Sequence, residues 1–473
     1  MHARFPFVLA LCTIVAGCAL KDLPPHDETV KQAMPNAASP DKWAAGATTG
    51  PVADAWLASL DEPRLDALVR EAVAYNADLQ LASARVDVAA AYYAGASSPL
   101  WPQVNLVARG GGKMSGDSSG LSGVGLFAAW EIDLWGRVRS TARATELQYE
   151  SAKLDAEYAR QSIAALVTKG WVLAVETRLQ KSFAEAALKS SDQLAVLARD
   201  RLRIGSGDEY DVALAQANVE SLRDTVRSLD LAYQNALRGL EALLGRYPAA
   251  VVAVAEELPT WKASVPAGLP SELLERRPDV VAAERRVAAA FYRTEEAKAA
   301  RLPRITLVAN FTSLSSELFI LQSRDNPVFS AGAGLIQPLF LGGLLQSQVD
   351  VRTAEQKAAI ADYGKVGLRA FGEVEGALAA GGNALERETI LARALRENER
   401  ALELSIIRYR VGSGDLRSVS QQQVTLYAAR VALLRVRSDQ LIQRVNLYLA
   451  LGGTFDAGPE APAKVGDASV APR

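Results

Sequence analysis

The residues best suited to catalysis or metal binding are confined to the start of this sequence. Its two cysteines are Cys12 and Cys18, and its two histidines are His2 and His26. The rest of the chain therefore offers no thiol nucleophile, no disulfide, no Cys/His zinc site and no histidine general base. An enzyme built on carboxylates stays possible, but the sequence predicts a protein that is not an enzyme and needs no metal or cofactor.

One pair of carboxylates has a spacing that could serve acid–base chemistry. Glu131 and Asp133 lie in the segment Trp130-Glu-Ile-Asp-Leu-Trp135 and could act as the two carboxylates of a glycosidase. Asp133, however, lies where the following helix needs an N-cap, a common role for aspartate. We therefore interpret the pair as part of a structural junction.

Two further clusters that could bind anions also receive structural interpretations. The run Arg109-Gly-Gly-Gly-Lys113 lacks the spacing of a phosphate-binding loop. Four arginines form a basic cluster, which we interpret as a solvated or inter-protomer salt-bridging face: Arg276, Arg277, Arg285 and Arg286. The formal net charge of the 473 residues is −2, and this balance does not favour nucleic acid as a partner.

The first residues have the features of a bacterial export signal. Residues 1–17 carry Arg4 and then an apolar run too short to cross a bilayer, which predicts a signal peptide. Val15-Ala16-Gly17 directly precede Cys18, as in a lipobox, so we predict that Cys18 is lipidated, with palmitate among its acyl chains. An ordinary signal peptide with an incidental cysteine is the alternative. Ala rather than Asp at position 19 favours the outer membrane, and residues 18–60 are predicted to be an extended, lipid-anchored segment.

The elements that follow occur twice. Matching residues recur in the same order about 200 positions apart. Among them are Asn76-Ala-Asp-Leu79 with Arg277-Pro-Asp-Val280, and Arg203-Ile-Gly-Ser-Gly-Asp208 with Arg410-Val-Gly-Ser-Gly-Asp415. We therefore expect a first repeat over residues 61–245 and a second over 271–452, with a linker at 246–270 and a tail at 453–473.

Each repeat is predicted to begin with a helix followed by two strands. The helices are expected at roughly 64–98 and 271–300, where prolines end them. Two runs of alternating polarity follow in each repeat, at about 103–112 and 122–132 within residues 103–132, and at about 304–314 and 327–337 within residues 304–337. Each run is about ten residues long, the length of a tilted membrane strand, although soluble hairpins alternate too.

Two very long helices are the most unusual feature. Residues 137–204 and 344–411 contain no proline, and a helix of about 68 residues would be roughly 100 Å long. Each is predicted to turn at Gly-Ser-Gly into a second helix, over 209–245 and 416–452. The fold class is therefore mainly α with membrane β strands.

The number of strands predicts an oligomer. Four strands cannot close a membrane barrel, because the smallest such barrels need about eight and open edges in lipid are costly. If the strands span a membrane, several protomers must share one barrel, and three copies would supply about twelve strands.

These motifs together resemble the outer-membrane factors, the TolC-like channels of efflux systems, and especially their lipidated NodT-type branch. The resemblance covers nearly all of the chain after Cys18. Its other motifs are Trp56-Leu-Ala-Ser-Leu-Asp-Glu-Pro63, Trp130-Glu-Ile-Asp-Leu-Trp-Gly-Arg137, Leu274-Glu-Arg-Arg-Pro-Asp279, Ala283-Glu-Arg-Arg-Val287 and Gln337-Pro-Leu-Phe-Leu-Gly-Gly343.

The resemblance implies a homotrimer in which a 12-stranded β-barrel in the outer membrane stands on a 12-helix periplasmic α-barrel. The linker and the tail would belong to an equatorial region. The implied partners are outer-membrane lipid, a periplasmic membrane-fusion adaptor and an inner-membrane pump, of the RND type. The family exports drugs, dyes, metals, siderophores or signals, and the sequence does not select among them.

The resemblance also assigns the two glycine turns and a gate. The turns would form the periplasmic tip that contacts the adaptor: Gly205, Ser206 and Gly207 with Gly412, Ser413 and Gly414. Asp211 and Tyr409 match a tyrosine–aspartate link that holds the closed state. The alternative for the turns is a helix reversal without a contact role, and for Asp211 and Tyr409 a helix-end carboxylate and a packing aromatic.

The sequence departs from the family at other gate positions. Gly414 stands where the arginine of a second link is expected, and Ser418 and Gln421 stand at an acidic constriction. We therefore expect a gate held in another way. A periplasmic adaptor and a coiled-coil scaffold lipoprotein are the alternatives to a channel, although an adaptor has one helical hairpin, whereas this sequence predicts two.

Overall fold

The computed structural model describes residues 20–37, 42–46, 50–52, 54–109, 121–259, 265–268, 270–316 and 328–456. The predicted signal peptide, Cys18 and most of the C-terminal tail lie outside these residues. Within them the chain forms two units, each assembled from three segments. The first comprises Met1–Ala38, Ser83–Asp155 and Asp279–Gly367, and the second Ser39–Ala82, Ala156–Pro278 and Leu368–Arg473.

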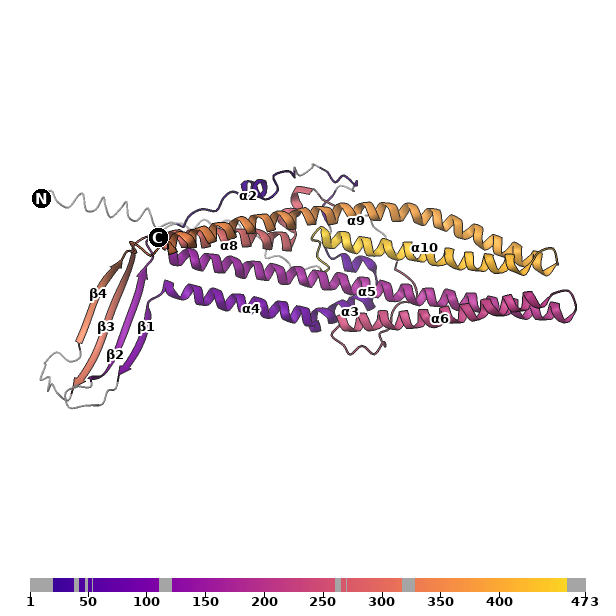
Figure 1. Cartoon of the computed structure of the whole chain (residues 1–473), viewed down its shortest axis with the longest axis horizontal. Coiled ribbons are helices and arrows are strands. Elements are labelled where there is room, and N and C mark those ends of the chain that lie inside the picture. Colours follow the sequence, from indigo (N-terminus) through magenta and orange to yellow (C-terminus); the bar gives the residue numbers. More distant parts are fainter. Residues whose placement is uncertain are drawn as a thin grey trace, which may run out of the picture. The chain divides into compact units, whose positions relative to one another are not determined.

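The first unit contains a four-stranded antiparallel sheet in the order β1-β2-β3-β4 (Figure 1). The strands are β1 (Gln103–Arg109), β2 (Leu121–Ile132), β3 (Arg304–Ser316) and β4 (Val328–Ile336). The long β2–β3 ladder, which runs from Leu121↔Ser316 to Ile132↔Ile305, joins the strands of the two repeats. Among the described residues β1 and β4 each pair on one side only, so the sheet has two open edges.

Among the strand residues whose burial the structure describes, no apolar side chain is buried. All nine residues of β4 are exposed. Exposed apolar side chains occur on every strand: Val104, Leu106, Val107, Val124, Leu126, Trp130, Leu307, Val308, Phe311, Val328, Phe329, Leu335 and Ile336. Side chains of this kind are stable when they contact lipid or another chain. No described helix combines the length and apolar character that crossing a membrane requires.

The helices of the first unit pack in part through small residues. They are α2 (His26–Ala33), α4 (Ala77–Ser97), η3 (Ser98–Leu100), α8 (Pro278–Ala299) and the beginnings of α5 (Arg137–Arg203) and α9 (Leu344–Arg410). A core of Ala144, Leu147, Ala288, Ala289 and Tyr292 joins α5 to α8.

The helix α2 was not expected, because residues 18–60 were predicted to be extended. That prediction is wrong for these eight residues. Asp27 and Glu28 in the first turn and Lys31 in the last favour the helix dipole, and His26 Nδ1 lies 2.8 Å from Glu284 Oε1 on α8. The composition of so short a polar helix resembles that of a linker.

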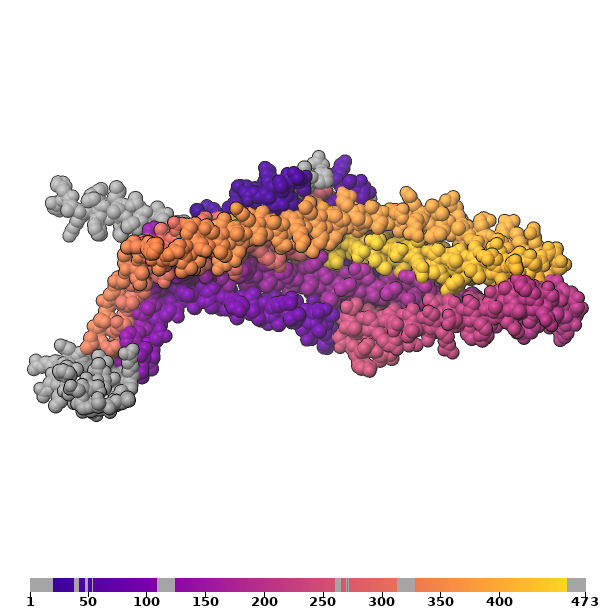
Figure 2. Space-filling view, in the orientation of Figure 1, coloured from indigo at the N-terminus to yellow at the C-terminus, as the bar shows by residue number. Residues whose placement is uncertain are grey.

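The second unit contains two helical hairpins of equal dimensions. The helices α5 and α9 are each 67 residues long, and each turns into a 35-residue helix, α6 (Glu209–Leu243) or α10 (Leu416–Ala450). At 1.5 Å per residue, each long helix extends over roughly 100 Å. The two hairpins lie against each other near their turns (Figures 1 and 2). The other elements of the unit are η2 (Trp56–Leu60), α3 (Pro63–Tyr75), η4 (Pro270–Glu272) and α7 (Leu273–Arg276).

The first helix of each repeat is broken where the sequence predicted continuity. Asn76 ends α3, and Arg277, which precedes Pro278 and so avoids the helical conformation, ends α7. Both side chains bind the end of a distant helix. Asn76 Nδ2 donates to the Leu243 carbonyl at 2.8 Å, and the buried Arg277 Nη1 donates to the Ala450 carbonyl at 3.4 Å. The repeats thus tie their helix ends at equivalent places.

A buried carboxylate holds the linker between the repeats. Glu241 is fully buried and accepts the backbone N–H groups of Ala250, Val251 and Val252 at 2.6, 2.7 and 3.1 Å. Burial alone would raise the pKa of Glu241, but these donors outweigh it, so the pKa lies below its ordinary value.

We expect Glu241→Gln to destabilise the protein by about 1–3 kcal/mol, because the amide cannot accept all three donors. The lowered pKa means that the ionised carboxylate stabilises the fold above the unfolded pKa of 4.5 and that this contribution is lost as the pH falls through the folded pKa. Thermal unfolding at pH 7 and at pH 4 measures both effects. The exposed Glu386→Gln is the control, and equal unfolding temperatures for the two variants would contradict the prediction.

Candidate functional site

The candidate catalytic pair Glu131 and Asp133 forms a structural junction between β2 and α5. Glu131 accepts two bonds from Arg137, at 3.0 and 2.8 Å. Asp133 accepts the backbone N–H groups of Val138 and Arg139 at 3.1 and 2.8 Å, so it caps α5 from four residues before the helix. Both carboxylates bind the first residues of α5, which supports a structural role for the pair rather than the catalytic role of a glycosidase.

The basic cluster is neutralised within the chain. Arg276 pairs with Asp54 at 2.8 Å, and Arg285 pairs with Glu150 at 3.3 Å. Arg286 pairs with Asp155, and Arg277 with Glu373. The expectation of a solvated face is wrong for Arg277, which is fully buried. The four paired carboxylates belong to this chain.

The two Gly-Ser-Gly turns adopt the same helix-ending geometry. In the first turn Gly205 N–H donates to Leu202 and Ser206 N–H to Arg201, at 3.0 and 2.9 Å. The second turn repeats this pattern with Gly412 and Ser413. The φ angles of +76° at Gly205 and +81° at Gly412 explain the glycines, since other residues are strained there. Ser206 and Ser413 are exposed at these ends.

The helices that follow the turns begin with matching caps. The Asp208 side chain accepts the Asp211 N–H at 2.8 Å, and the Asp415 side chain accepts the Ser418 N–H at 2.6 Å. The Ser418 N–H lowers the pKa of Asp415, which favours the charged cap. Both turns are therefore rigidly defined by local hydrogen bonds.

Below the turns an apolar cluster joins both hairpins. Its buried members come from α5, α6, α9 and α10: Leu194, Ala195, Ala198, Ala215, Val219, Tyr409, Leu416 and Val419. Tyr409 is the largest of them and is 1% exposed. The first hairpin contributes small side chains to this cluster, three alanines and a valine, so the Tyr409 ring is the bulkiest group between the two hairpins.

The structure brings the two predicted gate residues together. Tyr409 Oη donates to Asp211 Oδ2 at 3.2 Å, although the residues lie 198 positions apart. Burial raises the pKa of Tyr409 to about 12, and the neighbouring Asp211 carboxylate adds to this rise. The hydroxyl therefore stays protonated and can donate this bond across the physiological pH range.

Three positions depart from the family pattern at the gate: Gly414, Ser418 and Gln421, which are all uncharged. A Cβ at Gly414 would lie 3.1 Å from Arg408 Cβ, so the turn itself leaves little room there. Ser418 supplies the capped N–H already described, and Gln421 is exposed. Neither an arginine link at 414 nor an acidic ring at 418 and 421 exists in this chain.

Sequence reasoning missed two arginines that link the hairpins. Arg201, on α5, donates to the backbone carbonyl of Tyr409 on α9. Arg417, on α10, donates to Tyr210 Oη on α6 at 2.6 Å. Their positions next to the turns could have indicated a role at the tip. Arginine near a helix end is, however, usually interpreted as a cation that stabilises the helix dipole.

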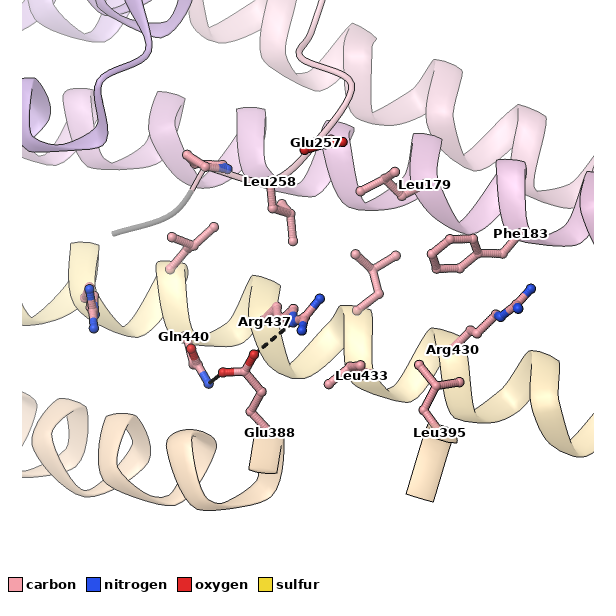
Figure 3. A pocket seen from close by; sticks show the side chains of 14 residues that line it. Leu179, Phe183, Glu257, Leu258, Glu388, Leu395, Arg430, Leu433, Arg437 and Gln440 are labelled. Carbon is pink, nitrogen blue, oxygen red and sulfur yellow. Dashed lines mark hydrogen bonds and ion pairs between the residues drawn. The ribbon is translucent and has the colours of Figure 1, made fainter. Parts of the chain in front are cut away.

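A cavity of about 720 Å³ lies between α5, α9, α10 and the linker (Figure 3). Its lining is mixed: leucines and one phenylalanine, with Leu179 and Phe183 on α5 facing Leu433 on α10, stand beside arginine and glutamate side chains. Within the cavity, the Glu388 carboxylate accepts hydrogen bonds from Arg437 and from Gln440, both at 2.9 Å, so these polar groups bind one another. Among the residues described, no three His, Cys, Asp or Glu side chains are grouped to hold a metal ion.

Comparison with known proteins decides the family. The sequence matches the family described as "Outer membrane efflux protein" over residues 68–246 and 269–453. The chain belongs to the outer membrane efflux protein family. The two matched ranges coincide closely with the two repeats of helices and strands.

Relatives of the family align over most of the chain. The pyoverdine export outer membrane protein OpmQ of Pseudomonas aeruginosa is 30% identical over 448 residues, which cover 90% of this chain and 94% of OpmQ. The cation efflux system protein CusC of Escherichia coli K12 is 26% identical, with coverage of 84% and 88%. The open-state MtrE outer membrane channel of Neisseria gonorrhoeae superposes with a TM-score of 0.79 at 27% identity, covering 92% and 99% of the two chains. The helix-rich fold with its four strands is thus that of an outer-membrane channel.

Proposed function

We propose that this chain is one protomer of a passive, homotrimeric efflux duct that crosses the outer membrane and extends into the periplasm. The observation that carries the proposal is a sheet with exposed apolar side chains and two open edges, in a chain with two hairpins whose long helices extend over roughly 100 Å each. Unpaired strand edges cost several kcal/mol per backbone group in lipid. Three copies, paired β4 to β1, satisfy every edge.

Reconstitution of the purified protein tests this proposal. We expect a trimer that resists dissociation in detergent until it is heated, and discrete single-channel currents in planar lipid bilayers. Three sheets of four strands closed edge to edge account for both properties. A monomer in detergent that produces no conductance would favour the coiled-coil scaffold instead.

The partners of the duct follow from its family. Relatives are named for pyoverdine export and for cation efflux, so different members serve different cargo. We propose that a periplasmic adaptor and an RND-type inner-membrane pump supply the energy and select the cargo here. We also propose that Cys18 anchors the chain by lipid, since the lipobox directly precedes it.

We place the adaptor contact at the turns 205–207 and 412–414. Both turns are exposed, and their backbones are rigid enough to present a defined surface. A photo-crosslinker at Ser206 or Ser413 should capture the adaptor in cells with active efflux. The same label at the exposed Glu386, far from both turns along α9, should not capture it. Absence of adducts from both serines would remove the turns from the interface.

We propose that Tyr409 and Asp211 hold the duct closed. They join α9 to α6 through the 3.2 Å hydrogen bond, and the buried ring fills the space between the hairpins. Separation of the hairpins requires this bond to break and the ring to be exposed.

The double variant Tyr409→Phe, Asp211→Ala should raise the mean conductance of the reconstituted channel, because it removes the hydrogen bond and leaves the ring in place. A single hydrogen bond to a charged group contributes about 1.5–3 kcal/mol, enough to change the open-to-closed ratio about tenfold or more. Single-channel recording measures this ratio. Currents identical to those of the unmodified channel would exclude the pair from the gate.

A further inference from the structure

One guanidinium contacts both the first turn and the gate tyrosine. Arg201 Nη2 donates to the Ser206 carbonyl at 3.0 Å, and Arg201 Nη1 donates to the Tyr409 carbonyl. The guanidinium carbon also lies 4.5 Å from the centre of the Tyr409 ring, a cation–π distance. Arg201 therefore connects the backbone of the turn at 205–207 to the backbone and the ring of Tyr409.

The equivalent arginine of the second repeat makes no such connection. Arg408 occupies the same place before the second turn, and its carbonyl accepts the Ser413 N–H as the Arg201 carbonyl accepts the Ser206 N–H. Its side chain is exposed and, in the part of the chain that the structure describes, has no hydrogen bond or ion pair. Identical residues at equivalent positions thus have different contacts, because only the first contacts the opposite hairpin.

We propose that Arg201 is the positioning residue through which the first tip turn controls the Tyr409–Asp211 link, so that the adaptor opens the duct by displacing residues 205–207 rather than 412–414. The inference rests on the gate proposed above and identifies how it is regulated. Arg201 touches neither cargo nor Asp211. It acts by fixing where the Tyr409 hydroxyl points.

The contacts explain why a shift of the turn reaches the tyrosine. The Tyr409 carbonyl lies in the last turn of α9, where the helix dipole places negative charge. The Ser206 carbonyl lies in the turn that follows α5, and one cation binds both carbonyls. Arg201 Nε is buried and has no hydrogen-bond partner among the described residues. The Ser206 bond is exposed, so displacement of that carbonyl removes one of the two backbone acceptors of the guanidinium and lets Nη2 turn to water, which favours withdrawal of the side chain.

Withdrawal of Arg201 has a defined consequence for the gate. The Tyr409 carbonyl keeps only its bond from the Gly412 N–H, at 3.1 Å, and the ring loses the cation on its face. The ring is then held by apolar packing and by Asp211 alone. The Asp211 bond, at 3.2 Å, is longer than most charge-assisted hydrogen bonds and depends on this orientation.

Chemical modification of the turns tests the coupling in the trimer alone. Single cysteines replace Ser206 or Ser413, and a bulky cationic methanethiosulfonate is added while the current through a planar bilayer is recorded. We expect a several-fold rise in mean conductance for Ser206→Cys and a clearly smaller one for Ser413→Cys. The unmodified channel treated with the same reagent accounts for the native cysteines. Equal responses of the two turns would overturn the proposal.

Substitution of the arginines tests whether Arg201 acts through Tyr409. Arg201→Ala and Arg201→Lys should raise the basal conductance and abolish the response of Ser206→Cys, because lysine cannot hold two carbonyls in fixed directions. The matched Arg408→Ala should leave both unchanged. Arg201→Ala combined with Tyr409→Phe should conduct no more than the stronger single variant, since both changes act on one link.

The outcomes distinguish this inference from the function it rests on. A heat-modifiable trimer on a gel shows that each variant is folded. If the trimer conducts and Tyr409→Phe changes its currents while Arg201→Ala does not, the gate stands and the coupling is wrong. If no variant forms a conducting trimer, and the unmodified chain does not either, the duct itself is wrong.

Discussion

Backbone N–H and C=O groups at the ends of helices and at the edges of sheets must find hydrogen-bond partners. Among the described residues, several helix ends are capped within the chain, whereas the two outer edges of the sheet are unpaired. Asp133, Asp208 and Asp415 cap helix starts, and Asn76 and Arg277 bind the last carbonyls of α6 and α10. These helix ends therefore find their hydrogen-bond partners within the chain. The edges of β1 and β4 have no partner strand among the described residues, and the proposed association of three copies through the sheet would supply one.

Glycines and prolines mark where the long helices begin and end, and this made most of the fold predictable from the sequence. Two proline-free runs ending at Gly-Ser-Gly specified the long helices to within a residue or two, because positive φ at Gly205 and Gly412 is a local requirement. The break at Asn76 was not predictable in this way. Asparagine is tolerated in helices, but here Asn76 Oδ1 accepts the Asp78 and Leu79 N–H groups at 2.9 and 3.2 Å and so caps the start of α4. Its Nδ2 binds the carbonyl of Leu243, a contact that only the tertiary structure supplies.

The candidate site shows the same limit more sharply. The sequence places Tyr409 and Asp211 far apart, and only the resemblance to a family paired them before the 3.2 Å contact was seen. Arg201 could not be found even so. Arg201 and Arg408 lie in equivalent motifs. Arg201 is half-buried and binds the opposite hairpin, whereas Arg408 is exposed, and this difference arises from what lies opposite each side chain. Local pattern determines the turn, whereas its neighbour determines what the turn contacts.

Internal duplication gives a physical reason for this division of labour. In the proposed duct two equivalent hairpins supply the helices of the tube, whereas the proposed gate is a single link, between Tyr409 and Asp211. At the second turn Gly414, Ser418 and Gln421 carry no charge, and Asp415 is engaged in capping its own helix. Two of the cations that cross between the hairpins, Arg201 and Arg417, contact a tyrosine of the opposite hairpin. Such contacts combine packing with a directional hydrogen bond, so they are lost together once the hairpins part, and a link of this kind favours two distinct states over gradual opening.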